Sequence, residues 1–405
     1  MFDAYKIRTD FPILNKLIDG KRNTYLDTAA SAQKPCAVIN RIIKAYEEEY
    51  ANVHRGSYLL SDLATSNYEN ARKIVQQFIG AKKKEEIIFT RGATEGINLV
   101  ASTYGAKNLG PNDEILLSKA EHHANLVPWQ QIALKTGAKL QYFELGENGE
   151  FVLENFLEKL NEKTKIVAVC AMSNVLGTVF DIKQICNEAH KIGAKVLVDA
   201  CQYAVHKKID VIDMGADFLA FSGHKVYGPT GIGVLYGKYD LLCEMPPYQF
   251  GGDMIEHVYY DRTTFTMPPA RFEAGTPAIV QAIGLGEALN YMMQFDFNEI
   301  EEHESKLTRY TTERLNEIKD LKILGNAENK GGVFSFDIKG IHPQDLAFVL
   351  GKEGIAVRTG HFCAEPLVNN LGYNSLTRAS LGIYSIKEDI DVFDKILEKA
   401  KSFLV

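Results

Sequence analysis

The sequence predicts an α/β protein in which helices cover both faces of a mostly parallel sheet. From about residue 86, short apolar runs alternate with helical segments, an order that is typical of parallel sheets. The clearest helix covers 181–193, where the isoleucines at 182, 185 and 192 share one face and a glycine ends the pattern. The predicted strands are 86–90, 114–119, 139–145, 165–172, 195–200, 217–221 and 232–236.

The segment after about residue 260 has a different pattern and predicts a smaller α+β domain. We expect a large domain over 20–265 and a small domain made of 1–19 and 266–405, with the N-terminal segment packed on the C-terminal lobe. The seam is expected within Pro246–Pro269, which is rich in proline, glycine and tyrosine. The expected helices of the small domain are 278–293, 298–319, 343–352 and 387–404, and its expected strands are 332–338 and 355–358.

The composition and charge argue against several classes of protein. The 405 residues include 45 basic and 52 acidic side chains, and the net charge of −7 gives no electrostatic reason to bind nucleic acid or an anionic membrane. No apolar run approaches the roughly 18 residues that a membrane span needs. The first residues, from Met1 to Pro12, lack the pattern of a secretory signal, so we expect the protein in the cytoplasm.

The six cysteines are scattered without CxxC or CxxH pairs, so neither a metal site nor a disulfide framework is expected. Cys363 has flanks that suit a reactive thiolate, because Gly360 gives the backbone freedom and Arg358 and His361 can favour negative charge. The other cysteines are expected to be small core hydrophobes: Cys36, Cys170, Cys186, Cys201 and Cys243.

Polar residues follow four of the predicted strands, at the edge where open parallel sheets bind ligands. Segment 91–96 leads from a strand into a helix through small residues and suits a phosphate, although Thr94 is equally well explained as a plain N-cap. His122 and His123 follow the next strand. Adjacent residues do not point the same way and no third ligand is nearby, so they are either loop histidines or one imidazole packed on a flat cofactor ring.

Two further groups complete the set. Asp199, at the end of an apolar strand, is either a helix-cap acid or a functional carboxylate. Lys225 is either a surface lysine or, with Ser222 and His224 beside it, a lysine that forms a Schiff base. Together the groups supply what pyridoxal phosphate (PLP) needs: an imine-forming amine, a carboxylate for the pyridine nitrogen, a planar side chain over the ring and donors for the phosphate.

Ordered motifs span nearly the whole chain. They are Tyr25–Ala30, Asn52–Gly56, Glu121–Asn125, Asp199–Gln202, Ser222–Lys225, Phe272–Pro277, Arg358–Ala364 and Arg378–Ser380. This set resembles the class V aminotransferases, which have PLP fold type I, and within them the SufS-like, group II cysteine desulfurases. The resemblance implies a large domain with a mostly parallel seven-stranded sheet, a smaller C-terminal α+β domain, and PLP as the cofactor.

The resemblance also implies a role for each matching residue near the cofactor. Lys225 would hold PLP covalently, Asp199 would pair with its pyridine nitrogen, and Gln202 would hydrogen-bond its ring oxygen. His122 would stack on the ring and is expected to be catalytic. The phosphate would be held by Thr94, Ser222 and His224.

Further roles concern the substrate and a second subunit. Asn174 and Arg378 would bind the substrate, and a guanidinium suits its carboxylate because the two groups can form a bidentate pair. Thr276 would reach the phosphate from the second subunit of a homodimer. The implied reaction converts L-cysteine into L-alanine: Lys225 moves the Cα proton, and the thiolate of Cys363 takes the sulfur as a persulfide.

Relatives pass such a persulfide to a SufE-like acceptor or to a zinc-containing SufU-like acceptor for Fe–S cluster assembly. His342 opens a predicted helix, and it is either a simple helix-entry residue or one that exchanges for a zinc ligand of a SufU-like partner. The chain departs from the family at Phe362, where His-His-Cys is common, so a proton-handling role for that second imidazole is in doubt.

Alternatives remain open at this point. A selenocysteine lyase or a cysteine-sulfinate desulfinase of the same family would share these motifs, and the sequence does not rank cysteine against selenocysteine. A non-catalytic scaffold for a sulfur-transfer complex would need none of Lys225, Asp199 and Cys363. An ordinary transaminase would leave Cys363 without a role. The physiological acceptor and the turnover rate are not encoded in any motif.

Overall fold

The predicted strands form one seven-stranded sheet in the computed structural model, which describes residues 2–404. The strand order is β4-β10-β9-β8-β7-β5-β6. Neighbours from β9 to β6 run parallel, whereas β10 is antiparallel to both β9 and β4. The prediction of a mostly parallel sheet is therefore confirmed. The strands are β4 (Ile87–Thr90), β5 (Glu114–Ser118), β6 (Lys139–Phe143), β7 (Thr164–Cys170), β8 (Lys195–Asp199), β9 (Phe218–Ser222) and β10 (Gly233–Gly237).

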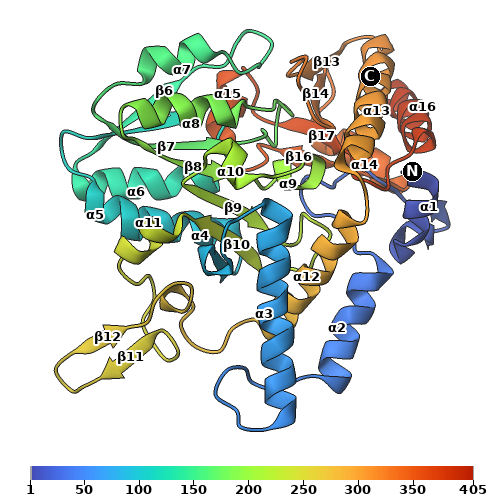
Figure 1. The fold of residues 1–405 in the computed structure, drawn as a ribbon. Helices are drawn as coiled ribbons and strands as arrows, with labels where there is room; N and C mark the ends of the chain where they lie inside the picture. The colour runs from blue at the N-terminus through green and yellow to red at the C-terminus, as the bar shows by residue number, and fades with distance from the viewer. Residues whose placement is uncertain (1, 405) are drawn as a thin grey trace.

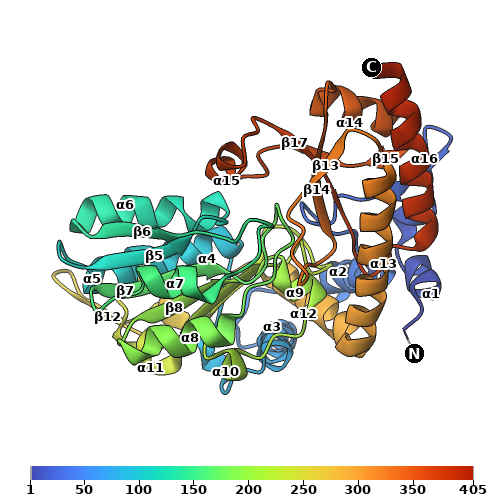
Figure 2. The ribbon, with the colours of Figure 1, turned by 90° about the horizontal axis from the view of Figure 1, so that it is seen from above.

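Helices cover both faces of this sheet (Figure 1, Figure 2). Successive side chains of a strand point to opposite faces, so Phe218 packs in one core with α4 and α6 while Leu219 packs in the other core with α3 and α8. Burial on both faces explains why the strands are continuous apolar runs. The helices are α3 (Leu59–Ile79), α4 (Ala93–Val100), α6 (Val127–Thr136) and α8 (Ile182–Lys191), and α8 confirms the predicted helix at 181–193.

Helix α3 packs with α2 (Cys36–Glu48) and α12 (Ile279–Met293), and the sequence pattern predicted only α12. Gly286 allows α12 and α3 to approach closely, because a Cβ there would lie 3.0 Å from the Cβ of Ala71. Helix α12 therefore packs on the large body, although it lies beyond the predicted boundary near residue 265. The domain division itself stays a prediction. Across residues 2–404, no helix combines the length and the apolar character that a membrane span needs.

A second, four-stranded antiparallel sheet has the order β13-β14-β17-β16. Its strands β13 (Leu321–Leu324) and β17 (Leu376–Ser380) were not predicted, whereas β14 (Val333–Ile338) was. The predicted strand at 355–358 is divided into β15 (Ile355–Ala356), which pairs with β3 (Thr24–Tyr25), and β16 (Arg358–Gly360). The expected helices are present as α13 (Phe297–Glu317), α14 (Pro343–Lys352) and α16 (Lys387–Leu404).

The N-terminal helix α1 (Ala4–Thr9) is tied to the C-terminal part of the chain. The buried guanidinium of Arg8 contacts the buried carboxylate of Asp389 at 2.8 Å. The predicted seam, in contrast, contains an arm that projects from the body (Figure 1). Its strands β11 (Ile255–Val258) and β12 (Thr263–Phe265) pair with each other and with no other strand of the described chain.

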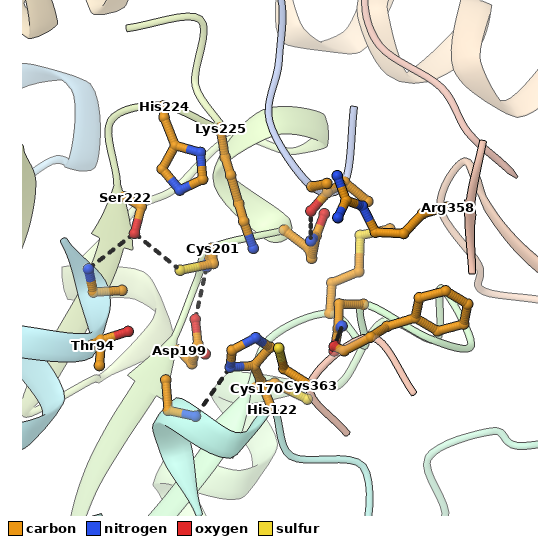
Figure 3. Close-up of a pocket in the computed structure, with 18 of the residues that line it drawn as sticks. Thr94, His122, Cys170, Asp199, Cys201, Ser222, His224, Lys225, Arg358 and Cys363 are labelled. Atoms are coloured by element: carbon orange, nitrogen blue, oxygen red, sulfur yellow. Dashed lines mark hydrogen bonds between the residues drawn. The ribbon is translucent and has the colours of Figure 1, made fainter. Parts of the chain in front are cut away.

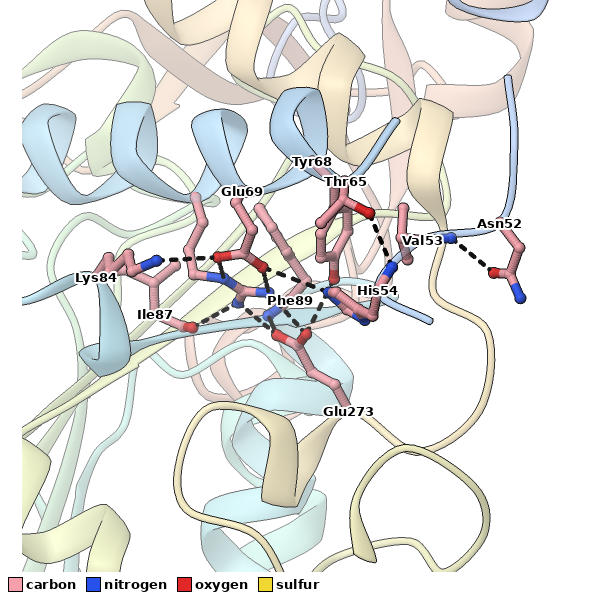
Figure 4. Close-up of polar contacts among 11 residues, drawn as sticks. Asn52, Val53, His54, Thr65, Tyr68, Glu69, Lys84, Ile87, Phe89 and Glu273 are labelled. Carbon is pink, nitrogen blue, oxygen red and sulfur yellow. Dashed lines mark hydrogen bonds and ion pairs between the residues drawn. The ribbon is translucent and has the colours of Figure 1, made fainter. Parts of the chain in front are cut away.

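A buried ion pair joins α3 to the loop that leads into α12 (Figure 4). Arg72 and Glu273 form two parallel contacts, of 2.7 and 2.8 Å. Arg72 also donates to the carbonyl oxygen of Ile87, and the amide of Phe89 donates to Glu273. These bonds satisfy the buried charges and fix the loop that carries Thr276.

Candidate active site

One cavity collects the ends of three central strands. Strands β7, β8 and β9 end at Cys170, Asp199 and Ser222, and all three residues line a cavity of about 390 Å³. Arg358 of β16 lines it from the second sheet (Figure 3). Arg378 of β17 lines it as well. The cavity therefore lies at the edge of the sheet where the sequence predicts a ligand.

The structure brings the predicted site residues to this cavity, with one exception. Thr276 is exposed and lines a different cavity, together with Tyr68 and Glu273, so it does not reach the first cavity within one chain. The predicted residues that line the first cavity are Thr94, His122, Asn174, Asp199, Gln202, Ser222, His224, Lys225, Cys363 and Arg378.

Lys225 extends into the cavity from the turn after β9 (Figure 3). Its amine has no hydrogen bond or ion pair with any described residue, so it is available for chemistry. The neighbouring His224 contacts the hydroxyl of Ser31 through Nδ1 at 3.2 Å. Burial, together with the charges of Lys225 and Lys34, lowers the pKa of His224 to about 4. His224 is therefore neutral at physiological pH.

Asp199 is a buried carboxylate at the end of β8. One of its oxygens accepts a hydrogen bond of 2.9 Å from the amide of Cys201, and no cation of the described chain pairs with it. This bond closes a local turn and is not a helix cap, because the next helix, α9 (Tyr203–His206), has Gln202 as its N-cap. The carboxylate faces the cavity instead. A buried carboxylate without a cationic partner is costly, which makes it a fitting partner for the protonated nitrogen of a bound ring.

His122 lies on the loop after β5, and its tautomer follows from one contact. Its Nδ1 accepts a hydrogen bond of 3.0 Å from the amide of Ala124. Burial and the charge of Lys225 lower the pKa of His122 to about 4. The ring is therefore neutral, carries its hydrogen on Nε2, and can act as a flat cover or as a proton donor.

The start of α4 makes a cup of donors. Helix α4 begins after Gly92, which is its N-cap in place of the predicted alternative Thr94. The hydroxyl of Ser222 accepts a hydrogen bond of 2.9 Å from the amide of Ala93. The backbone passes very close to β10 here, because a Cβ at Gly233 would lie 2.5 Å from the Cα of Gly92. A helix N-terminus with side-chain donors around it suits a phosphate.

Two buried polar atoms at the cavity lack partners, which tests whether the site fits PLP. Gln202 donates to the carbonyl oxygen of Ala29 at 2.8 Å, but its Oε1 is buried without a partner among residues 2–404. The Nε of Arg378 is buried without a partner as well. Buried polar atoms are rarely left unpaired, so both atoms are explained if a polar molecule occupies the cavity. The residues present fit PLP and a carboxylate substrate.

Cys363 is exposed and belongs to a loop with an unusual backbone. Phe362 and Cys363 have φ angles of +53° and +54°, in the left-handed region. The carbonyl oxygen of Cys363 accepts a hydrogen bond of 2.6 Å from the amide of His123, and the side chain of Asn174 donates to the carbonyl oxygen of Phe362 at 2.7 Å. The loop is thus tied to the large body on two sides.

Two guanidinium groups and one carboxylate lie next to this loop. Arg358 pairs with Asp27 at 2.8 Å, and the buried Arg378 lies 3.7 Å from the same carboxylate. Burial lowers the pKa of Arg378 to about 10, against the effect of Asp27, so the guanidinium stays charged at neutral pH. Two positive charges at the cavity favour an anionic substrate.

Two residues at or beside the cavity were given no role by the sequence analysis. Phe362 was noted only as a departure from the family, yet its ring lies against Arg378. Asp27 was only one residue of a motif, yet its carboxylate pairs with Arg358 and with Arg378.

The prediction for the remaining cysteines holds for Cys170 and Cys186, which are buried, but it is wrong for Cys36. Cys36 is exposed because it begins α2 at a helix end.

Comparisons with known proteins agree with this geometry. Residues 24–393 match the aminotransferase class-V family. The chain is 48% identical to a probable cysteine desulfurase of Halalkalibacterium halodurans over 401 residues, which cover 99% of this chain and 98% of that protein. It is 47% identical over 403 residues to a probable cysteine desulfurase of Staphylococcus aureus, with the same coverage of 99% and 98%.

Solved structures show the same fold. The crystal structure of the cysteine desulfurase CsdA from Escherichia coli superposes with a TM-score of 0.93, at 38% identity and with full coverage of both chains. The apo structure of a cysteine desulfurase from Thermococcus onnurineus gives a TM-score of 0.94 at 40% identity, covering 100% of this chain and 99% of that one. The fold is therefore PLP fold type I, and the chain belongs to the aminotransferase class-V family.

Proposed function

We propose that this protein is a PLP-dependent cysteine desulfurase that converts L-cysteine into L-alanine and takes the sulfur onto Cys363. One observation carries the proposal: the amine of Lys225 and the exposed thiol of Cys363 line the same cavity. A transaminase would use the lysine and leave the thiol idle. The relatives named as cysteine desulfurases support the same activity.

The residues that would hold PLP follow from the site. Lys225 would bind it covalently, and Asp199 would keep its pyridine nitrogen protonated. Gln202 would use its unpaired Oε1 or its amide nitrogen toward the ring oxygen, while His122 covers the ring. Thr94, Ser222 and His224 would hold the phosphate at the start of α4. When bound, PLP supplies an electron sink that stabilises negative charge on the substrate Cα.

The chain's own groups bind the substrate and move its protons. Arg378 would pair with the carboxylate of cysteine through its free Nε edge, and Asn174, whose carbonyl oxygen accepts from Arg378 at 3.0 Å, orients that guanidinium. Lys225, once the substrate amine displaces it, takes the Cα proton on Nζ and later returns a proton. His122 can donate a proton from Nε2.

The sulfur transfer is a displacement at sulfur. The thiolate of Cys363 attacks the substrate sulfur, so a new S–S bond forms as the Cβ–S bond breaks. The electron pair of the broken bond stays with the carbon fragment, which is released as alanine after protonation. Cys363 is left as a persulfide. Arg358 and Arg378 stabilise the attacking thiolate, because both guanidinium groups line the same cavity.

A single incubation tests the proposal. Purified protein with L-cysteine should release alanine, and the mass of the Cys363 peptide should increase by one sulfur. Cys363→Ser should abolish alanine formation from cysteine while the bound PLP keeps its visible absorbance. Cys36→Ser is the matched control, because that thiol is also exposed but lies outside the cavity, and it should retain full activity. Full turnover in Cys363→Ser would remove this residue from the mechanism.

The position of Thr276 supports a homodimer. It is exposed, follows the anchored Glu273 by three residues, and lies outside the cavity of its own chain, so it would reach the phosphate in the partner's cavity. Light scattering of the holoenzyme should give twice the chain mass. A monomer at micromolar concentration would contradict this arrangement.

The persulfide needs an acceptor, which we propose is a SufE-like or SufU-like protein serving Fe–S cluster assembly. His342 is the N-cap of α14, where its Nδ1 accepts a hydrogen bond of 3.3 Å from the amide of Gln344. The helix-entry role of His342 therefore has a structural basis. A role in zinc exchange would require this hydrogen bond to break. Turnover measured with a SufE-like protein and with a SufU-like protein distinguishes the two acceptor classes. A thiolate mechanism needs a reduced cysteine, which favours the cytoplasm as its location.

A further inference from the structure

The loop that carries Cys363 has a backbone that must be held in place. Phe362 and Cys363 are consecutive non-glycine residues in the left-handed region, at φ of +53° and +54°. Such a conformation is strained for a bulky side chain, and it persists only where the surroundings enforce it. The anchors of this loop are therefore part of how the nucleophile is positioned.

The side chain of Phe362 provides one such anchor. It is only 7% exposed, although the adjacent Cys363 is exposed. The guanidinium carbon of Arg378 lies 4.7 Å from the centre of its ring, which is the geometry of a cation–π contact. The carbonyl oxygen of Phe362 accepts a hydrogen bond from the side chain of Asn174. The two predicted substrate-binding residues, Asn174 and Arg378, therefore both contact Phe362.

The ring also covers Arg378 without blocking it. Arg378 uses Nη1 toward the carbonyl oxygen of Asn174, and its Nη2 lies 3.7 Å from Asp27. Its Nε is buried and unpaired. A ring on the face of a guanidinium leaves its edge available for a carboxylate, and it keeps water from that face, which strengthens the ion pair.

We propose that Phe362 is a positioning residue that docks the Cys363 loop onto Arg378 and shields the guanidinium from water. One aromatic side chain then serves two purposes: it places the nucleophile, and it strengthens the site for the substrate carboxylate. The shielding role rests on the proposed function, since it requires Arg378 to bind the carboxylate of cysteine. The docking role does not depend on any reaction.

Three variants of the holoenzyme separate the two roles. Phe362→Leu keeps an apolar cover but removes the π face, Phe362→Ala removes both, and Phe362→Tyr keeps both. Hydrogen–deuterium exchange reports docking through the amides of Ala364 and Glu365, which are hydrogen-bonded to His361 and His123. The KM for L-cysteine reports shielding. The melting temperature of each variant checks that the chain is folded, and exchange in α13 is the internal reference.

We expect exchange at Ala364 and Glu365 to be about three- to thirtyfold faster in Phe362→Leu and Phe362→Ala, the range of a cation–π contact that is partly desolvated. Phe362→Tyr should match the wild type. KM should rise several-fold in Phe362→Ala and much less in Phe362→Leu. Unchanged exchange in both Leu and Ala variants would overturn the docking role, and unchanged KM in Phe362→Ala would overturn the shielding role. Wild-type protein that forms no alanine would refute the proposed function, yet the exchange experiment would still decide the docking role.

Discussion

The amide of His123 donates a 2.6 Å hydrogen bond to the carbonyl oxygen of Cys363, so the loop that presents His122 to the cavity also holds the nucleophile's loop. The side chain of His123 adds a second tie, because its Nε2 accepts from the amide of Glu365 at 3.0 Å. These two hydrogen bonds thereby join the loop after β5 of the large sheet to the C-terminal part of the chain.

Replacing His123 should loosen the start of α15 (Glu365–Asn370) without unfolding the protein. His123→Ala removes the acceptor of the Glu365 amide but keeps the backbone bond to Cys363, and a lost hydrogen bond of this kind costs about 1 kcal/mol. Exchange of the Glu365 amide should therefore accelerate about fivefold. His257→Ala, on the projecting arm, should leave this amide unchanged. An equal effect in both variants would show that the tie is not specific.

Lys225 should be the covalent attachment site. Borohydride reduction of the purified protein should add a pyridoxyl mass to the peptide that contains Lys225, and Lys225→Ala should lose both this mass and the visible absorbance, because no other amine lines the cavity within the described chain. Lys34→Ala is the matched control. Lys34 is a half-buried amine that donates to the carbonyl oxygen of His224, and desolvation lowers its pKa to about 8, but it lies outside the cavity. Label on Lys34 would contradict the assignment.

Glu121 should make stability depend on pH. Burial raises the pKa of Glu121 to about 7 from its ordinary value of 4.5, although Ser118, Asn125 and the amide of Cys170 donate to it. The folded state thus holds a proton that the unfolded state releases, and the free energy of unfolding falls as the pH rises from 4.5 to about 7, by an amount on the order of 3 kcal/mol.

Glu121→Gln cannot titrate, so it isolates this effect. The stability of the wild type relative to Glu121→Gln should be greatest near pH 4.5 and should decline up to pH 7, as measured by denaturant unfolding at each pH. Glu154→Gln, an exposed position at the start of α7 (Leu153–Lys159), controls for a general loss of one carboxylate. A relative stability that is constant from pH 4.5 to 8 would show that Glu121 is ionised throughout.

Breaking the Arg72–Glu273 pair should be costly. Arg72→Ala leaves the carboxylate of Glu273 buried without its cation, and the loss of one partner of a buried pair typically costs about 3–5 kcal/mol. Lys306→Ala removes an exposed i,i+4 pair with Glu302 on α13 and should leave stability nearly unchanged. Thermal unfolding of both variants checks the difference. Similar melting temperatures would mean that water or another group replaces the lost cation.

Much of the site was predictable because its residues lie directly after buried strands. Asp199 and Ser222 are the last residues of β8 and β9, and Lys225 follows within one turn. The carboxyl ends of neighbouring parallel strands meet at one edge, so local pattern and strand order were sufficient to bring these side chains together. The placement of His122 and Thr94 follows from the same rule.

The rest depended on contacts that no local pattern records. Strands β13 and β17, of four and five residues, were missed because such short segments take their structure from what they pack against. Helices α2 and α3 were missed as well, although they are 13 and 21 residues long. Thr276 belonged to a motif, but only the structure shows that it lines a cavity other than the site of its own chain. Cys363 and Lys225 come from segments far apart in sequence.

The sequence by itself determined the sheet, the chemical identity of the cavity's polar groups and the family, because hydrophobic period and motif order are local properties of a chain. The tertiary structure decided how the nucleophile is held: by the amide of His123, by the left-handed backbone at Phe362 and by the guanidinium of Arg378. These contacts join segments that only packing brings into reach, and their energies exist only after the two sheets have docked.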